Sequence, residues 1–167
     1  FHRDPSPVKL LRTGNQLGKT TSGLAEVHWR CLGVHPHYET QEPPIEAWII
    51  CASWSQSLAI QQKFYALAWR YLIAETRFDS VNGFHANRPT ARYPNGSIVR
   101  FKTTQQNSLD LAGATIDLAM FDEPPKSPRI FEEVRKRLLR RQGTLLMCLT
   151  PVNAPCGWLR ELCEAGQ

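Results

Sequence analysis

The sequence contains no apolar run approaching the roughly 20 residues that cross a bilayer. It also has no signal-peptide segment, and its first residue is Phe1 rather than Met. We therefore expect neither a membrane protein nor a secreted one, and we expect the chain to be a piece of a longer protein. Internal repeats and low-complexity segments are absent as well.

Cysteine is sparse, and its spacing excludes the common zinc sites. The five cysteines are an odd number, and no two of them form the CxxC pair that many zinc sites use. Cys51 and Cys148 fall inside apolar runs, where a thiol behaves as a small hydrophobic side chain. We interpret all five as reduced thiols, with a disulfide as the less favoured alternative, and this favours an intracellular setting.

The overall balance of residues fits a single globular domain. The chain has 167 residues, of which 42% are hydrophobic and 21% charged, and this is long enough for one core. Its net charge of +5 permits an anionic partner, but charge alone does not choose between nucleic acid, a nucleotide or neither. We predict one domain over residues 1–167.

Short apolar runs alternate with longer amphipathic ones along the chain. The periodicity predicts helices at residues 19–32, 55–73, 127–140 and 157–164. Strands are expected at residues 8–11, 45–51, 91–93, 97–102, 115–121 and 143–149. Asn95-Gly96 is a strong hairpin signal, whereas residues 74–90 have no clear pattern. Strands that alternate with helices predict an α/β fold with a mostly parallel sheet.

The loop after the first strand reads TGNQLGKTT (residues 13–21) and is close to the phosphate-binding P-loop pattern GxxxxGK[ST], with Thr13 in place of the first glycine. Gly18 lets the backbone approach a phosphate, and the first amides of the helix point toward it. Lys19 supplies a charge between the β- and γ-phosphates of ATP, and the Thr20 hydroxyl is expected to bind Mg²⁺. The alternative is a glycine loop in which Lys19 is a solvated surface residue. The predicted nucleotide-binding residues are Gly14, Asn15, Gln16, Leu17, Gly18, Lys19, Thr20 and Thr21.

A second signal lies about a hundred residues further on. The apolar residues 118–121 run directly into Asp122-Glu123. A P-loop ATPase needs a carboxylate at the end of a neighbouring strand to hold Mg²⁺, for which we predict Asp122. The next carboxylate, Glu123, is then placed to orient or deprotonate the attacking water. Alone, such a pair often marks only the polar start of a loop, but together with the P-loop it predicts an ATPase.

A third signal is Thr150, which ends the next apolar run before Pro151. In P-loop folds with an extra strand between the P-loop strand and the carboxylate strand, the tip of that strand can present a polar side chain to the γ-phosphate. The alternative is that Thr150 only ends its strand and begins a turn. Both interpretations remain open on the sequence.

Three blocks, in this order and spacing, resemble the ATPase domain of the large terminase subunit, the DNA-packaging motor of tailed bacteriophages and related viruses. The blocks are TGNQLGKTT (13–21), LAGATIDLAMFDEPP (111–125) and LLMCLTP (145–151), and the opening FHRDPSPVKLLR resembles the stretch that precedes the family's P-loop. The resemblance covers most of the chain and is faint between residues 74 and 100. It implies a three-layer P-loop NTPase fold, with an extra strand between the Walker A and Walker B strands.

The resemblance also implies residue roles and partners. Lys19 and Thr20 correspond to Walker A, Asp122 to Walker B, Glu123 to the catalytic carboxylate and Thr150 to the coupling motif. The implied activity is Mg²⁺-dependent ATP hydrolysis that moves double-stranded DNA into a procapsid in the host cell cytoplasm. The implied partners are the portal protein, the small terminase subunit and further copies of the chain in a homo-oligomeric ring, with no membrane. The family usually continues into a nuclease domain, which nothing here resembles, so nuclease activity is not expected.

One departure from the family concerns an arginine. Many members carry one inside the Walker A loop or just before the glycine that leads into the Walker B strand, and here these positions hold Asn15, Gln16 and Ala112. The stabilising charge must then come from elsewhere in the chain or from a neighbouring subunit. The candidates are Arg92, Arg100, Arg135 and Arg137.

Other polar and aromatic residues have weaker functional interpretations. The basic cluster at residues 135–141 could contact DNA, but a solvated helix face that pairs with Glu132 and Glu133 is favoured. We expect His35 and His37, in a proline-rich loop, to be exposed rather than to bind metal. We interpret Trp54, Trp69 and Tyr71 as core residues rather than as base-stacking platforms.

Two rival functions are weighed against DNA packaging. A helicase-like DNA-dependent ATPase would share this sheet, but it would need a second RecA-like domain. A non-catalytic nucleotide-binding or assembly module would keep the P-loop for structure only. The combination of Lys19, Thr20, Asp122 and Glu123 argues against the second rival.

Overall fold

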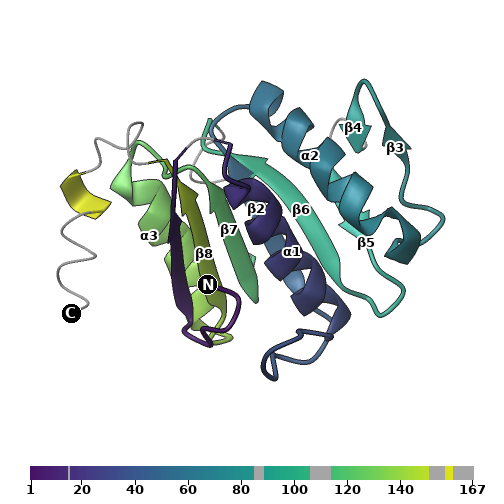
Figure 1. The fold of residues 1–167 in the computed structure, drawn as a ribbon, viewed down its shortest axis with the longest axis horizontal. Helices are drawn as coiled ribbons and strands as arrows, with labels where there is room; N and C mark the ends of the chain where they lie inside the picture. The colour runs from purple at the N-terminus through teal and green to yellow at the C-terminus, as the bar shows by residue number, and fades with distance from the viewer. Residues whose placement is uncertain (15, 85–88, 106–113, 151–156, 160–167) are drawn as a thin grey trace.

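The structure is a computed structural model that describes residues 1–14, 16–84, 89–105, 114–150 and 157–159. Six strands form one sheet in the order β1-β8-β7-β2-β6-β5 (Figure 1). The strands are β1 (Val8–Arg12), β2 (Glu46–Cys51), β5 (Thr90–Arg92), β6 (Ile98–Thr103), β7 (Leu118–Asp122) and β8 (Thr144–Leu149). Every neighbouring pair is parallel except β5 and β6, which are antiparallel.

Strand β8, the last strand among the described residues, lies between β1 and β7. Leu11 pairs with Cys148 on one side of it, and Phe121 pairs with Met147 on the other. The predicted extra strand between the Walker A and Walker B strands is therefore confirmed. Because parallel strands end at the same edge of a sheet, this order brings the residues that follow β1, β7 and β8 together.

Three longer helices cover the two faces of the sheet and make a three-layer α/β architecture. They are α1 (Lys19–Leu32), α2 (Trp54–Ala68) and α3 (Pro128–Leu139). Helices α1 and α2 lie over one face and can be followed in Figure 1. Helix α3 packs on the opposite face, against β7 and β8.

The central strands are apolar on both sides because both faces are covered. Ile49 and Met120 point into the core beneath α1 and α2, whereas their neighbours Ile50 and Phe121 point into the core beneath α3. All four side chains are 0% exposed. The continuous apolar runs of the sequence thus correspond to strands buried in the middle layer.

The helix ends follow the local sequence. Gly33 adopts φ 73° at the end of α1, and its amide donates to the carbonyl of Arg30. The Ser127 side chain accepts from the amide of Arg129 at the start of α3. The second helix is shorter than predicted, because it becomes a 3₁₀ turn, η1 (Trp69–Tyr71), and the amide of Ile73 then donates to the carbonyl of Arg92.

The segment without a clear pattern contains a two-stranded hairpin that the sequence did not predict. Its strands are β3 (Phe78–Asp79) and β4 (Gly83–Phe84), each too short for an alternation to be visible. The Asp79 carboxylate accepts from the amides of Val81 and Asn82 in the turn. Phe78 stacks on Tyr65 of α2 with ring centroids 4.0 Å apart, so the hairpin is anchored to that helix.

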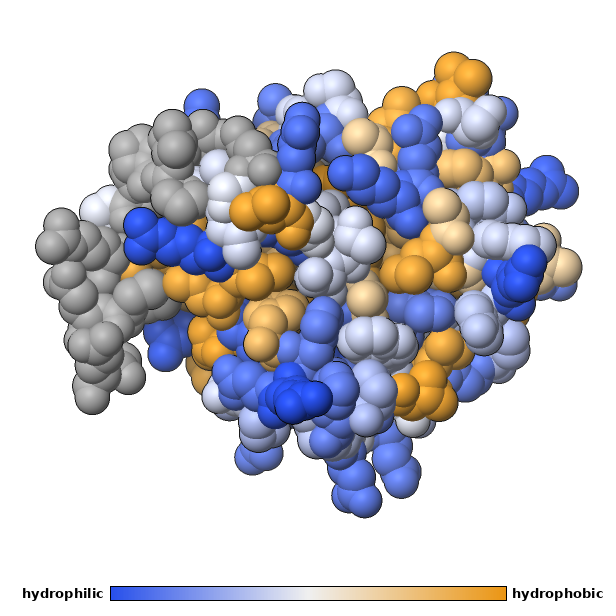
Figure 2. Space-filling view, in the orientation of Figure 1, coloured by the Kyte–Doolittle hydropathy of each residue, from blue (hydrophilic) through white to orange (hydrophobic). Residues whose placement is uncertain are grey.

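On the face shown in Figure 2, apolar groups are interspersed among hydrophilic residues. Trp54, Trp69 and Tyr71 are 41%, 51% and 50% exposed, so their expected place in the core was wrong. They lie on or just after α2, and Tyr71 also contacts the ring of His28 on α1. No helix among the described residues is long and apolar enough to cross a membrane.

Candidate active site

The loop between β1 and α1 is shaped for a phosphate group. Gly18 has φ 80° immediately before the first turn of α1, and Gln16 has φ 60°. The amide of Thr13 donates to the carbonyl of Leu149 on β8, at 3.4 Å. Lys19 is the first residue of the helix, and its ammonium donates to the carbonyl of Gly14 at 2.9 Å. The loop therefore curls over the positive end of α1, where backbone amides favour anions.

A pocket of about 360 Å³ lies above this helix terminus. It is lined by Gln16, Gly18, Lys19, Thr20, Thr21 and Lys63. Gly14 takes part through its carbonyl, whereas Leu17 is 70% exposed and is not part of the lining. Asn15 lies outside the described residues. A pocket with two ammonium groups and a helix N-terminus is suited to the phosphates of a nucleotide.

The folded chain brings Thr20 and Asp122 together across 102 residues. The Thr20 hydroxyl donates to one oxygen of Asp122 at 2.7 Å, and the side-chain amide of Gln56 donates to the other at 3.4 Å. Burial raises the pKa of Asp122, and the charge of Glu123 adds to that effect, while the Thr20 hydrogen bond and the charges of Lys63 and Lys19 oppose it. A cation beside Asp122 would relieve this unfavourable burial of negative charge.

Thr20 and Asp122 fit Mg²⁺ better than a transition metal. Mg²⁺ prefers oxygen ligands and is usually held by one or two protein groups together with water and phosphate oxygens. Among the described residues there is no cluster of three or more His, Cys, Asp or Glu side chains that could hold a metal. The hydroxyl at the start of α1 and the carboxylate at the end of β7 thus match a metal that arrives with a nucleotide.

Glu123 lies directly after β7 and contacts the end of β8. One oxygen of its carboxylate accepts from the Thr150 hydroxyl at 2.5 Å, and the other accepts from the Thr150 amide at 2.9 Å. Its own amide donates to the carbonyl of Cys148 at 2.8 Å. The structure thus places Thr150 against the predicted catalytic carboxylate rather than free at a strand tip.

Two residues near the site were not singled out in the sequence. Gln56 contacts Asp122 and Lys63 lines the phosphate pocket, and both belong to α2, for which the sequence predicted only a long amphipathic helix. The signal that could have found them is their spacing. Positions seven apart lie on one helix face, and this helix starts at the end of a strand next to β7.

The four arginines proposed to stabilise charge lie away from the pocket. Arg100 pairs with Glu46 at 2.5 Å, and Arg92 is on β5, at the far edge of the sheet. Arg135 pairs with Glu132 and Arg137 with Glu133 on α3. Of the described lining residues, the only cations are Lys19 and Lys63.

The basic residues of α3 form the paired helix face that the sequence favours. Arg135, Lys136 and Arg137 each contact Glu132 or Glu133 three or four positions away. Arg141 pairs instead with Asp117 at 2.9 Å. These contacts account for most of the cluster without DNA.

The expectation that His35 is exposed was wrong. Its side chain is 0% exposed and contacts Glu26, a fully buried residue of α1. The proline-rich loop brings a histidine back onto the helix instead of into solvent. His37 is exposed, as expected.

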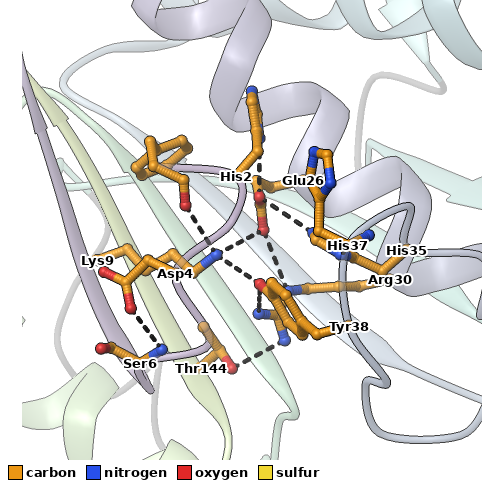
Figure 3. Close-up of polar contacts among 11 residues, drawn as sticks. His2, Asp4, Ser6, Lys9, Glu26, Arg30, His35, His37, Tyr38 and Thr144 are labelled. Atoms are coloured by element: carbon orange, nitrogen blue, oxygen red, sulfur yellow. Dashed lines mark hydrogen bonds and ion pairs between the residues drawn. The ribbon is translucent and has the colours of Figure 1, made fainter.

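Glu26, in the second half of α1, is the centre of a polar cluster (Figure 3). Its carboxylate contacts four cationic or potentially cationic side chains, from four different segments. These are His2 at 2.8 Å, Lys9 at 3.3 Å, Arg30 at 3.4 Å and His35 at 3.2 Å. The Tyr38 hydroxyl accepts from Lys9 and Arg30, and Thr144 of β8 accepts from Arg30. The cluster ties the start of the chain and residues 34–44 to α1.

The three described cysteines, Cys31, Cys51 and Cys148, are buried and free, in agreement with the predicted reduced thiols. Burial raises the pKa of Cys51 and of Cys148 to about 12. The Cys148 thiol donates to the carbonyl of Lys19 at 3.4 Å. Cys156 and Cys163 lie outside the described residues.

A strand, a phosphate loop and a helix that starts with lysine, beside a strand that ends in two carboxylates, define the P-loop NTPase class. Within that class, the family model for the terminase large subunit of T4-like viruses, N-terminal part, matches residues 10–154. The chain belongs to this large terminase subunit family.

A solved structure gives the same fold. The large terminase ATPase domain of Thermus phage P74-26, in a point-mutant form, superposes with a TM-score of 0.66 at 22% sequence identity. The match covers 96% of the present chain and 65% of that chain. No curated protein matches the sequence.

Proposed function

We propose that this chain is the ATPase domain of a viral DNA-packaging motor, and that it hydrolyses ATP with Mg²⁺. The observation that carries the proposal is the meeting of Thr20 with Asp122 and of Glu123 with Thr150 beside a P-loop. Membership of the large terminase subunit family supports the packaging role. The domain is proposed to span residues 1–167.

In the proposed site, the loop residues 14–21, Asn15 included, bind the phosphates, and Lys19 leaves the Gly14 carbonyl to contact them. Thr20 and Asp122 would hold Mg²⁺, which would supply positive charge beside the phosphates. The water oxygen forms a bond to the γ-phosphorus, the bond to the bridging oxygen breaks with its electrons leaving on ADP, and Glu123 takes the proton of the water. Thr150 holds the Glu123 carboxylate in place.

The work done by this hydrolysis is proposed to be translocation of double-stranded DNA into a procapsid. By family membership, the partners are the portal protein, the small terminase subunit and further copies of the chain in a ring. The place of action is then the host cell cytoplasm. The basic net charge of +5 suits a chain that works on DNA.

The substitution Glu123→Gln tests the chemistry. Removing the base should leave ATP binding close to wild type and lower turnover by about 10²–10⁴-fold. Binding is measured by titration with ATP and Mg²⁺, and turnover by phosphate release, with the protein alone and assembled on the portal. Glu132→Gln on the exposed face of α3 is the matched control. Hydrolysis at the wild-type rate by Glu123→Gln would remove Glu123 from the proposed role.

A further inference from the structure

The phosphate pocket contains a second ammonium group whose role the sequence does not predict. Lys63 of α2 lines the pocket together with residues of the P-loop. It is exposed, and among the described residues no carboxylate pairs with it. In contrast, Lys9 contacts Glu26, Arg100 contacts Glu46, and the α3 cations contact their own glutamates.

Helix α2 turns one face toward the site. Gln56 and Lys63 are seven residues apart, which is about two turns of an α-helix, so their side chains leave the helix on the same side. Gln56 reaches the carboxylate of Asp122, and Lys63 reaches the pocket above Thr20 and Thr21. The start of α2 is fixed by the Ser53 side chain, which accepts from the amide of Gln56.

Lys63 shares the pocket with Lys19 and Thr20, the two P-loop residues that are predicted to contact phosphate and Mg²⁺. Lys19, meanwhile, is held by the carbonyl of Gly14. Because Lys63 lines the same pocket as Lys19 and Thr20, its ammonium is within electrostatic reach of the position where Mg²⁺ and the outer phosphates would lie.

We propose that Lys63 contacts the terminal phosphate of the bound ATP and so supplies positive charge to it from α2. The inference rests on the proposed ATPase function. A lysine ammonium on its four-carbon stem is a mobile point charge with three donors. It donates hydrogen bonds to γ-phosphate oxygens, whose charge must be stabilised as the phosphoryl group transfers, and it neither gains nor loses a proton.

The test compares Lys63→Ala and Lys63→Arg with wild type. Dissociation constants are measured for the β,γ-imido analogue of ATP and for ADP, each with Mg²⁺, and kcat and KM are measured for ATP. Lys63→Ala should bind the triphosphate analogue about 10- to 100-fold more weakly, as expected for a lost hydrogen bond between charged groups. ADP affinity should stay close to wild type, and Lys63→Arg should restore most of the loss. Lys136→Ala, on the exposed face of α3, is the matched control.

The outcomes separate this inference from the function on which it rests. If wild type neither binds the triphosphate analogue nor hydrolyses ATP, the proposed function fails. If wild type does both and Lys63→Ala does them equally well, only the role of Lys63 is overturned. An equal loss of ADP and triphosphate affinity also overturns it, because that pattern indicates a contact that is not specific for the terminal phosphate. Thermal unfolding midpoints confirm that each variant is folded.

Discussion

At the scale of single residues, Glu123 has the most constrained geometry in the site. Its φ is 74°, in the left-handed region where a residue with a side chain is strained by about 1–3 kcal/mol. Three hydrogen bonds hold it there, one from its amide to Cys148 and two from Thr150 to its carboxylate. Strain of this kind persists where the surroundings over-determine a conformation, which is common at catalytic positions.

The Thr150 hydroxyl is therefore expected to matter for catalysis without touching the nucleotide. In Thr150→Val the hydroxyl donor is lost while the amide donor remains, so the Glu123 carboxylate loses one of its two restraints. We expect kcat to fall by about tenfold, the lower end of what a hydrogen bond to a charged group contributes, with KM little changed.

The conservative variant Thr150→Ser keeps the hydroxyl and should retain most of the activity. Steady-state ATP hydrolysis measures both variants. Equal rates for Thr150→Val and wild type would show that the amide alone positions Glu123.

At the scale of the elements, the packing of α1 on the sheet depends on a glycine. A Cβ at Gly23 would lie 2.6 Å from the Cε of Met120 and 2.7 Å from the Sγ of Cys148. Both side chains are almost fully buried, so neither has free space to move into. The start of α1, with Lys19 and Thr20, sits close to β7 and β8 for this reason.

We expect Gly23→Ala to destabilise the fold by about 1–3 kcal/mol, because overpacking outweighs the better helix propensity of alanine. Urea unfolding measures the change. Gly157→Ala is the matched control, because a Cβ there meets no atom of the described residues within 4 Å, and it should leave stability almost unchanged. A Gly23→Ala protein as stable as wild type would mean that the helix can shift outward at little cost.

Much of the element pattern could be predicted from the sequence, and the failures have physical reasons. The first helix was predicted with its observed bounds because Lys19 and Gly33 mark its two ends. The β5–β6 hairpin followed from Asn95-Gly96, and Gly96 has φ 86°. The hairpin β3–β4 was missed because two-residue strands carry no alternation.

The site was predictable where one motif carries the chemistry, and less so where distant segments meet. The P-loop and Asp122-Glu123 could be read directly. Lys63 and the buried position of His35 could not, because each depends on which helix face meets which loop in the folded chain. The periodicity of apolar residues in a sequence predicts the buried face of a helix, but it does not identify the neighbour of each polar side chain.

At the scale of the whole molecule, Glu26 joins parts of the chain that the sheet alone does not hold. Its buried carboxylate accepts from side chains at the start of the chain, on β1 and α1, and in residues 34–44. Burial raises the pKa of Glu26, but the hydrogen bonds from His2 and His35 and the charge of Lys9 outweigh that effect, so the pKa is lowered overall. The carboxylate therefore stabilises the fold while it is ionised.

The stability of the fold should decrease on acidification in two stages. Burial lowers the pKa of His28, and burial lowers that of His35 although Glu26 opposes it. Below pH 6.5, the ordinary histidine pKa, the unfolded chain then binds more protons than the folded one. The stability of the fold therefore decreases as the pH is lowered. Below pH 4.5, the ordinary glutamate pKa, the unfolded chain also binds more protons than the folded one, because the pKa of Glu26 is lowered in the folded chain. The contribution of the ionised carboxylate to stability is lost as the pH falls through that lowered pKa.

Urea unfolding between pH 8 and pH 4 measures this dependence. In His28→Gln the decline between pH 7 and pH 5 should be less steep, because one buried titrating ring is gone while a side-chain amide can still bond to the Tyr93 hydroxyl, which contacts His28 at 2.9 Å. His37→Gln, at an exposed position, is the matched control. An unchanged slope in His28→Gln would assign the decline to other groups.

The hydrogen bond from Lys19 to the Gly14 carbonyl has a consequence for how the site selects its ligand. The Lys19 ammonium is not free in solvent, so a nucleotide must replace the Gly14 carbonyl as its hydrogen-bond acceptor. Binding is thus an exchange, and its free energy is the difference between a phosphate and a neutral carbonyl as acceptors for one ammonium. Weakly charged ligands gain little binding free energy from such an exchange, whereas a polyphosphate gains much. The loop therefore selects for highly charged ligands as well as binding them.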